Sequence, residues 1–154
     1  MAVLRLATLS DIETLGDLLG ELFAQEREFA PDRTAQMRGL ALLFDQADAV
    51  RIVVAEVGQR VVGMGVLHYT ISTYLGAKVA LLEDVVVAAR HRGTGTGKRL
   101  MTAIIEQARS DGAQRITLLT DHDNHTAQRF YESFGFARST MQPYRLMLLS
   151  TATV

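Results

Sequence analysis

The stretch "ARHRGTGTGKRLM", Ala89 to Met101, decides how the rest of this chain is interpreted. Three glycines alternate with threonines among basic residues, after an apolar run and before a helical pattern. The first backbone N–H groups of a helix lack intrahelical partners, and the helix dipole places partial positive charge there. Glycine lets the backbone approach a ligand closely. The stretch therefore predicts an anion-binding loop, suited to the phosphates of a cofactor.

Sequence patterns narrow the choice of cofactor. The Walker pattern fails because it needs glycine at Arg92 and Ser or Thr at Arg99. The dinucleotide pattern GxGxxG fails because Lys98 takes the place of its last glycine. The pattern [QR]xxGx[GA] fits twice, in "RHRGTG" and in "RGTGTG". A solvated, flexible basic turn is the alternative interpretation.

Composition limits the classes of protein to which the chain can belong. A length of 154 residues predicts one domain, spanning 1–154, and the net charge of −1 gives no general attraction to nucleic acid or anionic membranes. The chain has no cysteine, which excludes disulfides, thiolate metal sites and a cysteine nucleophile. His122 and His125 lack a third metal ligand at an evident spacing, so no metal is expected. No signal peptide or membrane-length apolar run is apparent, so we expect a cytoplasmic protein.

Hydrophobic periodicity predicts an alternation of strands and helices typical of a mixed α/β domain. The expected order is β-α-α-β-β-β-α-β-α-β-β. The strands are predicted at Val3–Leu9, Arg51–Val57, Val61–Ile71, Val79–Val87, Arg115–Thr120, Phe136–Met141 and Tyr144–Leu149, and the helices at Ile12–Phe23, Thr34–Phe44, Leu100–Ala108 and His125–Phe134.

A second motif, "NHTAQRFYESFGF", lies about thirty residues after the glycine-rich loop. Taken alone it predicts an ordinary packing helix. Together with "VVVAARHRGTGTGKRLM" it resembles the GNAT superfamily of acetyl-CoA-dependent N-acetyltransferases. The matching signature is Asn-x-x-Ala-x-x-Phe-Tyr-x-x-x-Gly-Phe, with Asn124, Ala127, Phe130, Tyr131, Gly135 and Phe136 in place.

The resemblance implies a fold and a cofactor site. The expected fold is a mixed, mostly antiparallel sheet of about seven strands with about four helices, split between the fourth and fifth strands. Acetyl-CoA would enter this split, its pantetheine pairing with the backbone of Val85 and Val87 and its arm lying against Asn124. Its pyrophosphate would accept hydrogen bonds from the amides of the loop. These are the amides of Arg92, Gly93, Thr94, Gly95, Thr96, Gly97 and Lys98.

Amine acetylation requires two proton transfers, because the ammonium must lose a proton and the departing thiolate leaves more readily if it gains one. The resemblance makes Tyr131 the candidate acid. Strand alternation puts Glu83 on the same side as Val85 and Val87, which makes Glu83 the candidate base. A bulge would reverse this parity, so Asp84 is held in reserve. Glu83 could instead merely pair with a neighbouring cation.

The expected activity is acetyl transfer to a primary amine of a small molecule, polyamine-like or amino-acid-like, by direct attack in a ternary complex. Glu26 and Glu28 could attract a cationic amine or could equally be solvated helix-end charges. The alternatives are a protein or peptide N-acetyltransferase and a non-catalytic acyl-CoA-binding sensor on the same fold. No nucleic acid or membrane partner is expected, and a homodimer is a further expectation that the resemblance suggests.

Overall fold

The computed structural model describes residues 1–26 and 28–149. The chain forms two compact units, Met1–Leu119 and Thr120–Val154, which are described separately below. The first unit contains the whole sheet and three of the helices, and the second contains the helix α4, His125–Glu132.

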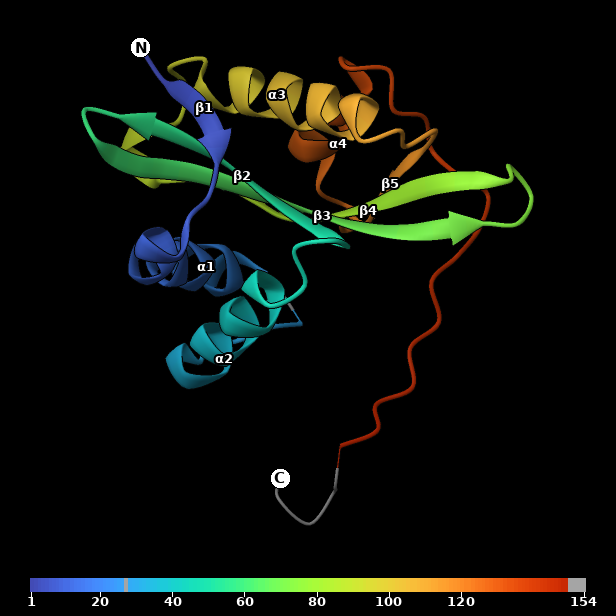
Figure 1. The fold of residues 1–154 in the computed structure, drawn as a ribbon, viewed down its shortest axis with the longest axis horizontal. Helices are drawn as coiled ribbons and strands as arrows, with labels where there is room; N and C mark the ends of the chain where they lie inside the picture. Colours follow the sequence, from blue (N-terminus) through green and yellow to red (C-terminus); the bar gives the residue numbers. More distant parts are fainter. Residues whose placement is uncertain (27, 150–154) are drawn as a thin grey trace. The chain divides into compact units, whose positions relative to one another are not determined.

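The first unit is built on one five-stranded sheet with the strand order β1-β2-β3-β4-β5 (Figure 1). The first four strands pair antiparallel, and β5 pairs parallel to β4. The strands are β1 at Val3–Leu6, β2 at Val50–Val57, β3 at Arg60–Ser72, β4 at Ala77–Val87 and β5 at Ile116–Leu118.

Helices cover both faces of the sheet. Helices α1, Ile12–Gln25, and α2, Arg33–Phe44, lie on one face, and α3, Thr96–Ser110, lies on the other (Figure 1). Two short 3-10 turns, η1 at Leu9–Asp11 and η2 at Ala89–His91, precede α1 and α3. This arrangement places the start of α3 directly after the end of β4.

Apolar side chains fill the layers between the sheet and the helices. On the α1 face, Leu15 and Leu40 pack with Met64 and Val86 in one buried cluster. On the other face, the apolar side of α3 is fully buried. Complete burial of one such side chain contributes about 1.5–3 kcal/mol, so these contacts hold β4 and α3 firmly in place.

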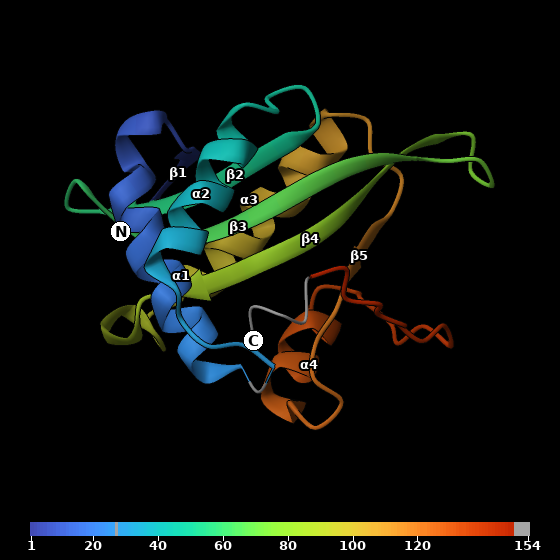
Figure 2. The same cartoon turned by 90° about the horizontal axis from the view of Figure 1, so that it is seen from below.

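The pairing of β4 with β5 is short and ends in mid-strand. It covers only Ala80 to Leu82, while β4 continues to Val87 (Figure 2). Beyond Leu82, β4 pairs with β3 through Glu83, Val86 and Val87 and has, within the described residues, no strand on its other edge. The split predicted between the fourth and fifth strands is confirmed.

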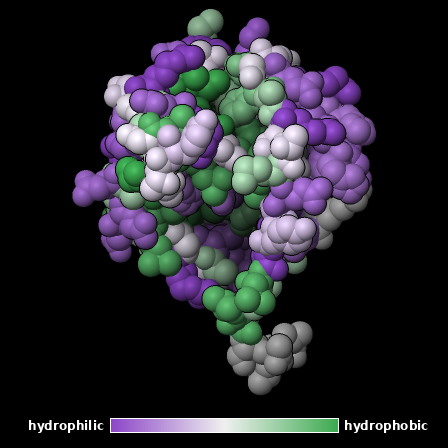
Figure 3. Space-filling view, turned by 90° about the vertical axis from the view of Figure 1, so that its right-hand side faces the viewer, coloured by the Kyte–Doolittle hydropathy of each residue, from purple (hydrophilic) through white to green (hydrophobic). Residues whose placement is uncertain are grey.

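The expected number of strands was wrong. In the described part of the chain, neither Phe136–Met141 nor Tyr144–Leu149 joins a sheet. Figure 3 shows apolar side chains, in green, on the surface of the protein, and those of residues 144–149 are largely exposed, with Leu148 at 89%. An alternating apolar pattern indicates which side chains of a strand would be buried. It does not show that a neighbouring strand is present for backbone hydrogen bonding.

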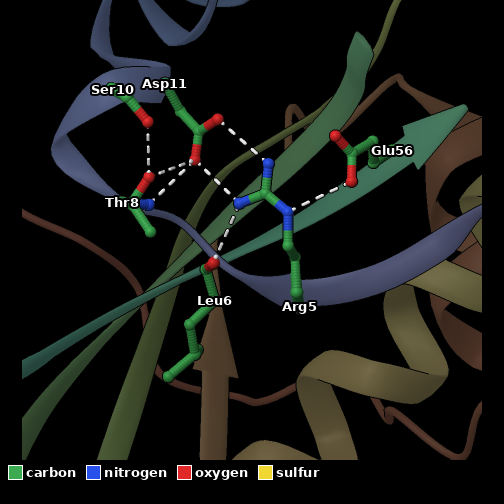
Figure 4. Close-up of polar contacts among 6 residues, drawn as sticks. All are labelled: Arg5, Leu6, Thr8, Ser10, Asp11 and Glu56. Atoms are coloured by element: carbon green, nitrogen blue, oxygen red, sulfur yellow. Dashed lines mark hydrogen bonds and ion pairs between the residues drawn. The ribbon is translucent and has the colours of Figure 1, made fainter. Parts of the chain in front are cut away.

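A charged cluster attaches β1 to the start of α1 (Figure 4). Arg5 donates two hydrogen bonds to Asp11, at 2.8 and 3.0 Å, and a third to Glu56 in β2 at 3.3 Å. The Asp11 carboxylate also accepts the backbone N–H of Thr8 at 2.8 Å. These contacts, with Arg5 first among them, lower the pKa of Asp11, and they fix the angle at which α1 leaves the sheet.

Candidate active site

The glycine-rich loop joins β4 to α3 and adopts a left-handed backbone at two positions. Gly95 is the N-cap of α3 with φ 84°, and Gly93 has φ 74°. Residues with a Cβ rarely adopt these angles, which explains the glycines in this part of the motif. The backbone turns sharply here, and helix α3 begins at the next residue, Thr96.

The loop holds a run of backbone donors that point to no protein acceptor. Among the described residues, no backbone N–H group from Gly93 to Lys98 donates a hydrogen bond. The threonines instead order the loop from within. The Thr94 hydroxyl donates to the His91 carbonyl at 2.6 Å and lies 2.9 Å from the Thr96 hydroxyl. The loop is thus a pre-shaped set of amides at the positive end of a fifteen-residue helix.

Backbone groups at the end of β4 face the open edge of the strand. Ala88 N–H donates to the Val62 carbonyl of β3 at 2.7 Å. Because successive residues of a strand direct their backbone groups to opposite edges, Val87 faces away from β3. By the same alternation Val85 also faces the open edge. The Val87 carbonyl there accepts a hydrogen bond from Arg92 Nε at 3.0 Å.

A bulge in β4 separates Glu83 from the two valines. Glu83 pairs with Val66 and Val86 with Met64, so Asp84 and Val85 together lie opposite Gly65. Asp84 has φ 57°, a left-handed conformation uncommon for a residue other than glycine. One extra residue in the strand reverses the alternation of its side chains.

The expected side-chain parity was therefore wrong. Glu83 pairs with Val66, a member of the core cluster that packs on α1. Val85 and Val87 lie on the opposite side, beside Gly65 and Gly63, where the α3 side chains pack. Glu83 does not share a side with Val85 and Val87, and the physical reason is the extra residue at Asp84.

Asp84 has the most perturbed carboxyl group of the site. Burial, followed by the negative charges of Glu83 and Glu26, raises its pKa to about 6. The half-buried position reduces the hydration of the Asp84 carboxylate, and the two neighbouring negative charges repel it. Both effects favour the protonated form. A carboxyl group that titrates near neutral pH is suited to accept and release a proton.

Helix α4 presents the other two predicted site residues in the second unit. Asn124 is its N-cap, and its side-chain oxygen accepts the Ala127 N–H at 3.1 Å. The Tyr131 ring makes edge contacts with Phe130 and Phe136, with ring centroids 5.7 and 6.0 Å apart. The structure thus gathers Glu83, both valines and the loop in the first unit, and it puts Asn124 and Tyr131 on one helix of the second.

Sequence reasoning missed the contribution of α1 to this site. The Glu21 carboxylate accepts the backbone N–H of Ala89 at 3.1 Å and lies 4.0 Å from the guanidinium of Arg92. Sixty-eight residues separate Glu21 from Ala89 in the chain. No local pattern marks such a contact, because it depends on how α1 packs across the sheet.

The described residues, 1–26 and 28–149, contain no group of three or more His, Asp or Glu residues that could hold a metal ion. None of their helices combines the length and hydropathy needed to cross a membrane.

The fold and the site define a mixed α/β protein in which a glycine-rich loop with unpaired amides follows a strand with an open edge. A profile of the Acetyltransferase (GNAT) family matches residues 14–136, most of the chain. The chain therefore belongs to the GNAT family, and the protein is an acetyltransferase. The resemblance on which the sequence analysis relied is confirmed.

Individual relatives agree with this assignment. The chain is 31% identical over 125 residues to YhfO, an uncharacterised N-acetyltransferase of Bacillus subtilis, covering 79% of this chain and 83% of the relative. It is also 31% identical over 78 residues to the thialysine N-epsilon-acetyltransferase of Bos taurus, covering 51% of this chain and 45% of that protein.

A solved structure shares the fold over nearly the whole chain. The crystal structure of a possible acetyltransferase from Clostridium difficile 630 matches with a TM-score of 0.87 and 18% identity. The match covers 97% of this chain and 99% of the other. At that level of identity the comparison concerns the fold alone.

Proposed function

We propose that this enzyme transfers the acetyl group of acetyl-CoA to a primary amine of a small, polyamine-like or amino-acid-like molecule. The observation that carries the proposal is the run of unpaired amides from Gly93 to Lys98, next to the open edge of β4. A diphosphate needs several donors converging from one side, and a pantetheine arm needs an unpaired strand edge. The first unit offers both features within a few residues.

The donor would be held largely by backbone groups. The unpaired loop amides from Gly93 to Lys98 would bind the diphosphate, with Lys98 adding a full positive charge. The Arg92 amide, which the sequence also predicted as a donor, already donates to the Ala89 carbonyl at 3.3 Å. Val85 and Val87 would pair with the amides of pantetheine. Asn124 would contact the same arm. Bound acetyl-CoA supplies an acetyl group activated as a thioester. The side chains of this protein would accept the proton of the amine and donate a proton to the departing thiolate.

The transfer forms one nitrogen–carbon bond and breaks one carbon–sulfur bond. An alkylammonium with a pKa of about 10.4 must first lose a proton, which the carboxylates of Glu83 and Asp84 would accept. Attack by the neutral amine then expels the thiolate, to which the Tyr131 hydroxyl would give its proton. The second proton, which the new amide nitrogen must lose, would return to the Tyr131 oxygen and restore the acid. Tyrosine and carboxylates act here as acid and base around a direct transfer between two bound reactants.

Electrostatics at the bulge supports both the base and the type of acceptor. The pKa of Asp84, raised to about 6, leaves the group ionised near neutral pH yet able to take up a proton. The charges of Glu26 and Glu83 that raise it also favour a cation at the same place. The thialysine enzyme among the relatives has a name that specifies an amino-acid-like substrate.

Release of free thiol from acetyl-CoA tests the proposal across a panel of amines. We expect turnover with diamines, polyamines or lysine analogues, and none with acetyl-CoA alone beyond slow hydrolysis. Turnover confined to peptides would support the protein or peptide alternative instead. Binding of CoA by calorimetry without turnover of any amine would support a sensor.

A further inference from the structure

The 3-10 turn η2, which leads into the glycine-rich loop, is capped by a residue of another helix. Ala89 begins this turn, and its N–H needs an acceptor. The preceding residue, Ala88, has no polar side chain and makes no capping hydrogen bond. Glu21 of α1 takes that role, because its Oε2 accepts the Ala89 N–H at 3.1 Å. A single carboxylate thus attaches the start of the loop to α1.

The same oxygen also approaches the other end of this turn. Glu21 Oε2 lies 4.0 Å from Arg92 Nη2, and Arg92 Nε donates to the Val87 carbonyl at 3.0 Å. Arg92 therefore has two negative neighbours, a carbonyl that it binds and a carboxylate slightly beyond hydrogen-bond distance. The side chains of Glu21 and Arg92 are 42% and 43% exposed, so both can move without disturbing the core.

We propose that Glu21 is a positioning residue for the cofactor, acting through Ala89 and Arg92. The inference rests on the proposed function, since it assumes that pantetheine pairs with Val87. The Arg92 side chain occupies the Val87 carbonyl, which the cofactor must take over. When pantetheine binds the Val87 carbonyl, the guanidinium of Arg92 moves to the nearby carboxylate of Glu21. Glu21 also keeps its hydrogen bond to Ala89 and so holds the start of the loop in place.

Without Glu21, the displaced Arg92 would have no carboxylate to bind and the turn would lose its cap. Both losses weaken binding of the cofactor but leave the reacting groups in place. We therefore expect a higher KM for acetyl-CoA and a nearly unchanged kcat. A merely structural role in α1 would instead lower the amount of folded protein and leave both constants of the folded fraction unchanged.

Asp17 provides a matched control. It lies one turn before Glu21 on α1 and lines the same surface cavity of about 300 Å³, but it pairs with Arg33 of α2 at 2.6 Å. D17N removes a negative charge from the same helix without touching the loop. Glu21→Gln keeps an oxygen for Ala89 and removes only the charge that Arg92 would use.

The experiment combines calorimetry with CoA and steady-state kinetics on the wild type, E21A, E21Q, D17N, R92A and E21A/R92A. We expect E21A to raise the Kd for CoA and the KM for acetyl-CoA about fivefold, the effect of one charge-assisted contact at an exposed site. E21Q should raise both about twofold, because the cap remains, and D17N should change neither. In the R92A background, loss of Glu21 should cost about two- to threefold, because only the cap on Ala89 remains to be lost.

Distinct results separate this inference from the proposed function. If the wild-type protein takes up no CoA, the proposed function is wrong and the inference fails with it. If the wild type binds CoA and E21A binds it equally well, only the role of Glu21 is overturned. Full additivity of E21A and R92A, or an equal effect of D17N, would also contradict it. E21Q preserves the size of the side chain and serves if E21A does not fold.

Discussion

Asp84 combines a left-handed backbone, a half-buried carboxyl group and two nearby negative charges. Its pKa, about 6 in the folded protein against 3.8 ordinarily, makes the folded state bind more protons than the unfolded state between these values. Stability therefore falls as pH rises from about 4 to 6 and stays lower above 6. Asn tolerates the same backbone conformation, so Asp84→Asn changes mainly the charge.

We expect D84N to be more stable than the wild type by about 1–2 kcal/mol at pH 7.5, and to gain little near pH 3.5, where the folded state is protonated and the unfolded state largely so. Urea unfolding at the two pH values measures the difference. A destabilised D84N at pH 7.5 would mean that the carboxylate is stabilised by contacts stronger than the burial and repulsion around it.

The base proposal predicts a pH profile. If Asp84 accepts the proton of the amine, kcat/KM should fall below pH about 6 in the wild type, and D84N should lower the plateau by about 10²-fold or more. The matched variant E83Q distinguishes the roles of Asp84 and Glu83. If only E83Q loses the fall in kcat/KM at low pH, the base is Glu83. Unchanged profiles in both variants would exclude the pair.

The Tyr131 hydroxyl is the proposed acid, and a single substitution can remove it. Replacing it with Phe keeps the ring contacts with Phe130 and Phe136 and removes only the hydroxyl. We expect kcat to fall by about 10²-fold or more with the Kd for CoA nearly unchanged, because general acid catalysis acts in the transition state. Equal turnover by the wild type and the variant would remove the acid role.

The glycine-rich loop and α3 form one structural unit whose shape depends on glycine. Gly95 has φ 84°, and an added Cβ would meet no atom within 4 Å. Gly95→Ala should therefore destabilise the protein through backbone strain alone, by about 1–2 kcal/mol, and should weaken CoA binding by changing the path of the amides.

Gly39 of α2 is the matched control, since an added Cβ there also meets no atom within 4 Å and its φ is not left-handed. Gly39→Ala should stabilise the protein by up to about 1 kcal/mol through helix propensity and leave CoA binding unchanged. Thermal unfolding and calorimetry measure both variants. A destabilising G39A would show that space in α2 is tighter than the backbone indicates.

Elements also differ in how well the sequence predicts them. The α3 helix was found because apolar residues recur at helical spacing after a glycine-rich turn, and the structure starts it at Thr96. The apolar run predicts strand β4. It does not predict the bulge over a regular strand, because no residue type in "LLEDVVV" demands an extra residue. The last two strands were predicted from alternation and did not form in the described residues.

Binding of CoA should be coupled to the stability of the whole protein. A ligand that binds only the folded state stabilises it by RT ln(1 + [L]/Kd), about 2.7 kcal/mol at a hundredfold excess over Kd. We expect CoA to raise the midpoint of thermal unfolding. Pantetheine, which lacks the diphosphate, should raise it less, because it cannot bind the loop amides. Equal shifts with both compounds would contradict binding of the diphosphate by the loop.

The family, the order of the main elements and the position of the glycine-rich loop can all be predicted from the sequence. These features are local: a helix start, a glycine that permits positive φ and a hydrophobic period are each written in neighbouring residues. The tertiary structure alone decided the side of the sheet on which Glu83 lies, the raised pKa of Asp84 and the cap that Glu21 gives to Ala89. Those features depend on strand register and on the approach of α1, contacts between residues far apart in the chain that no short pattern contains.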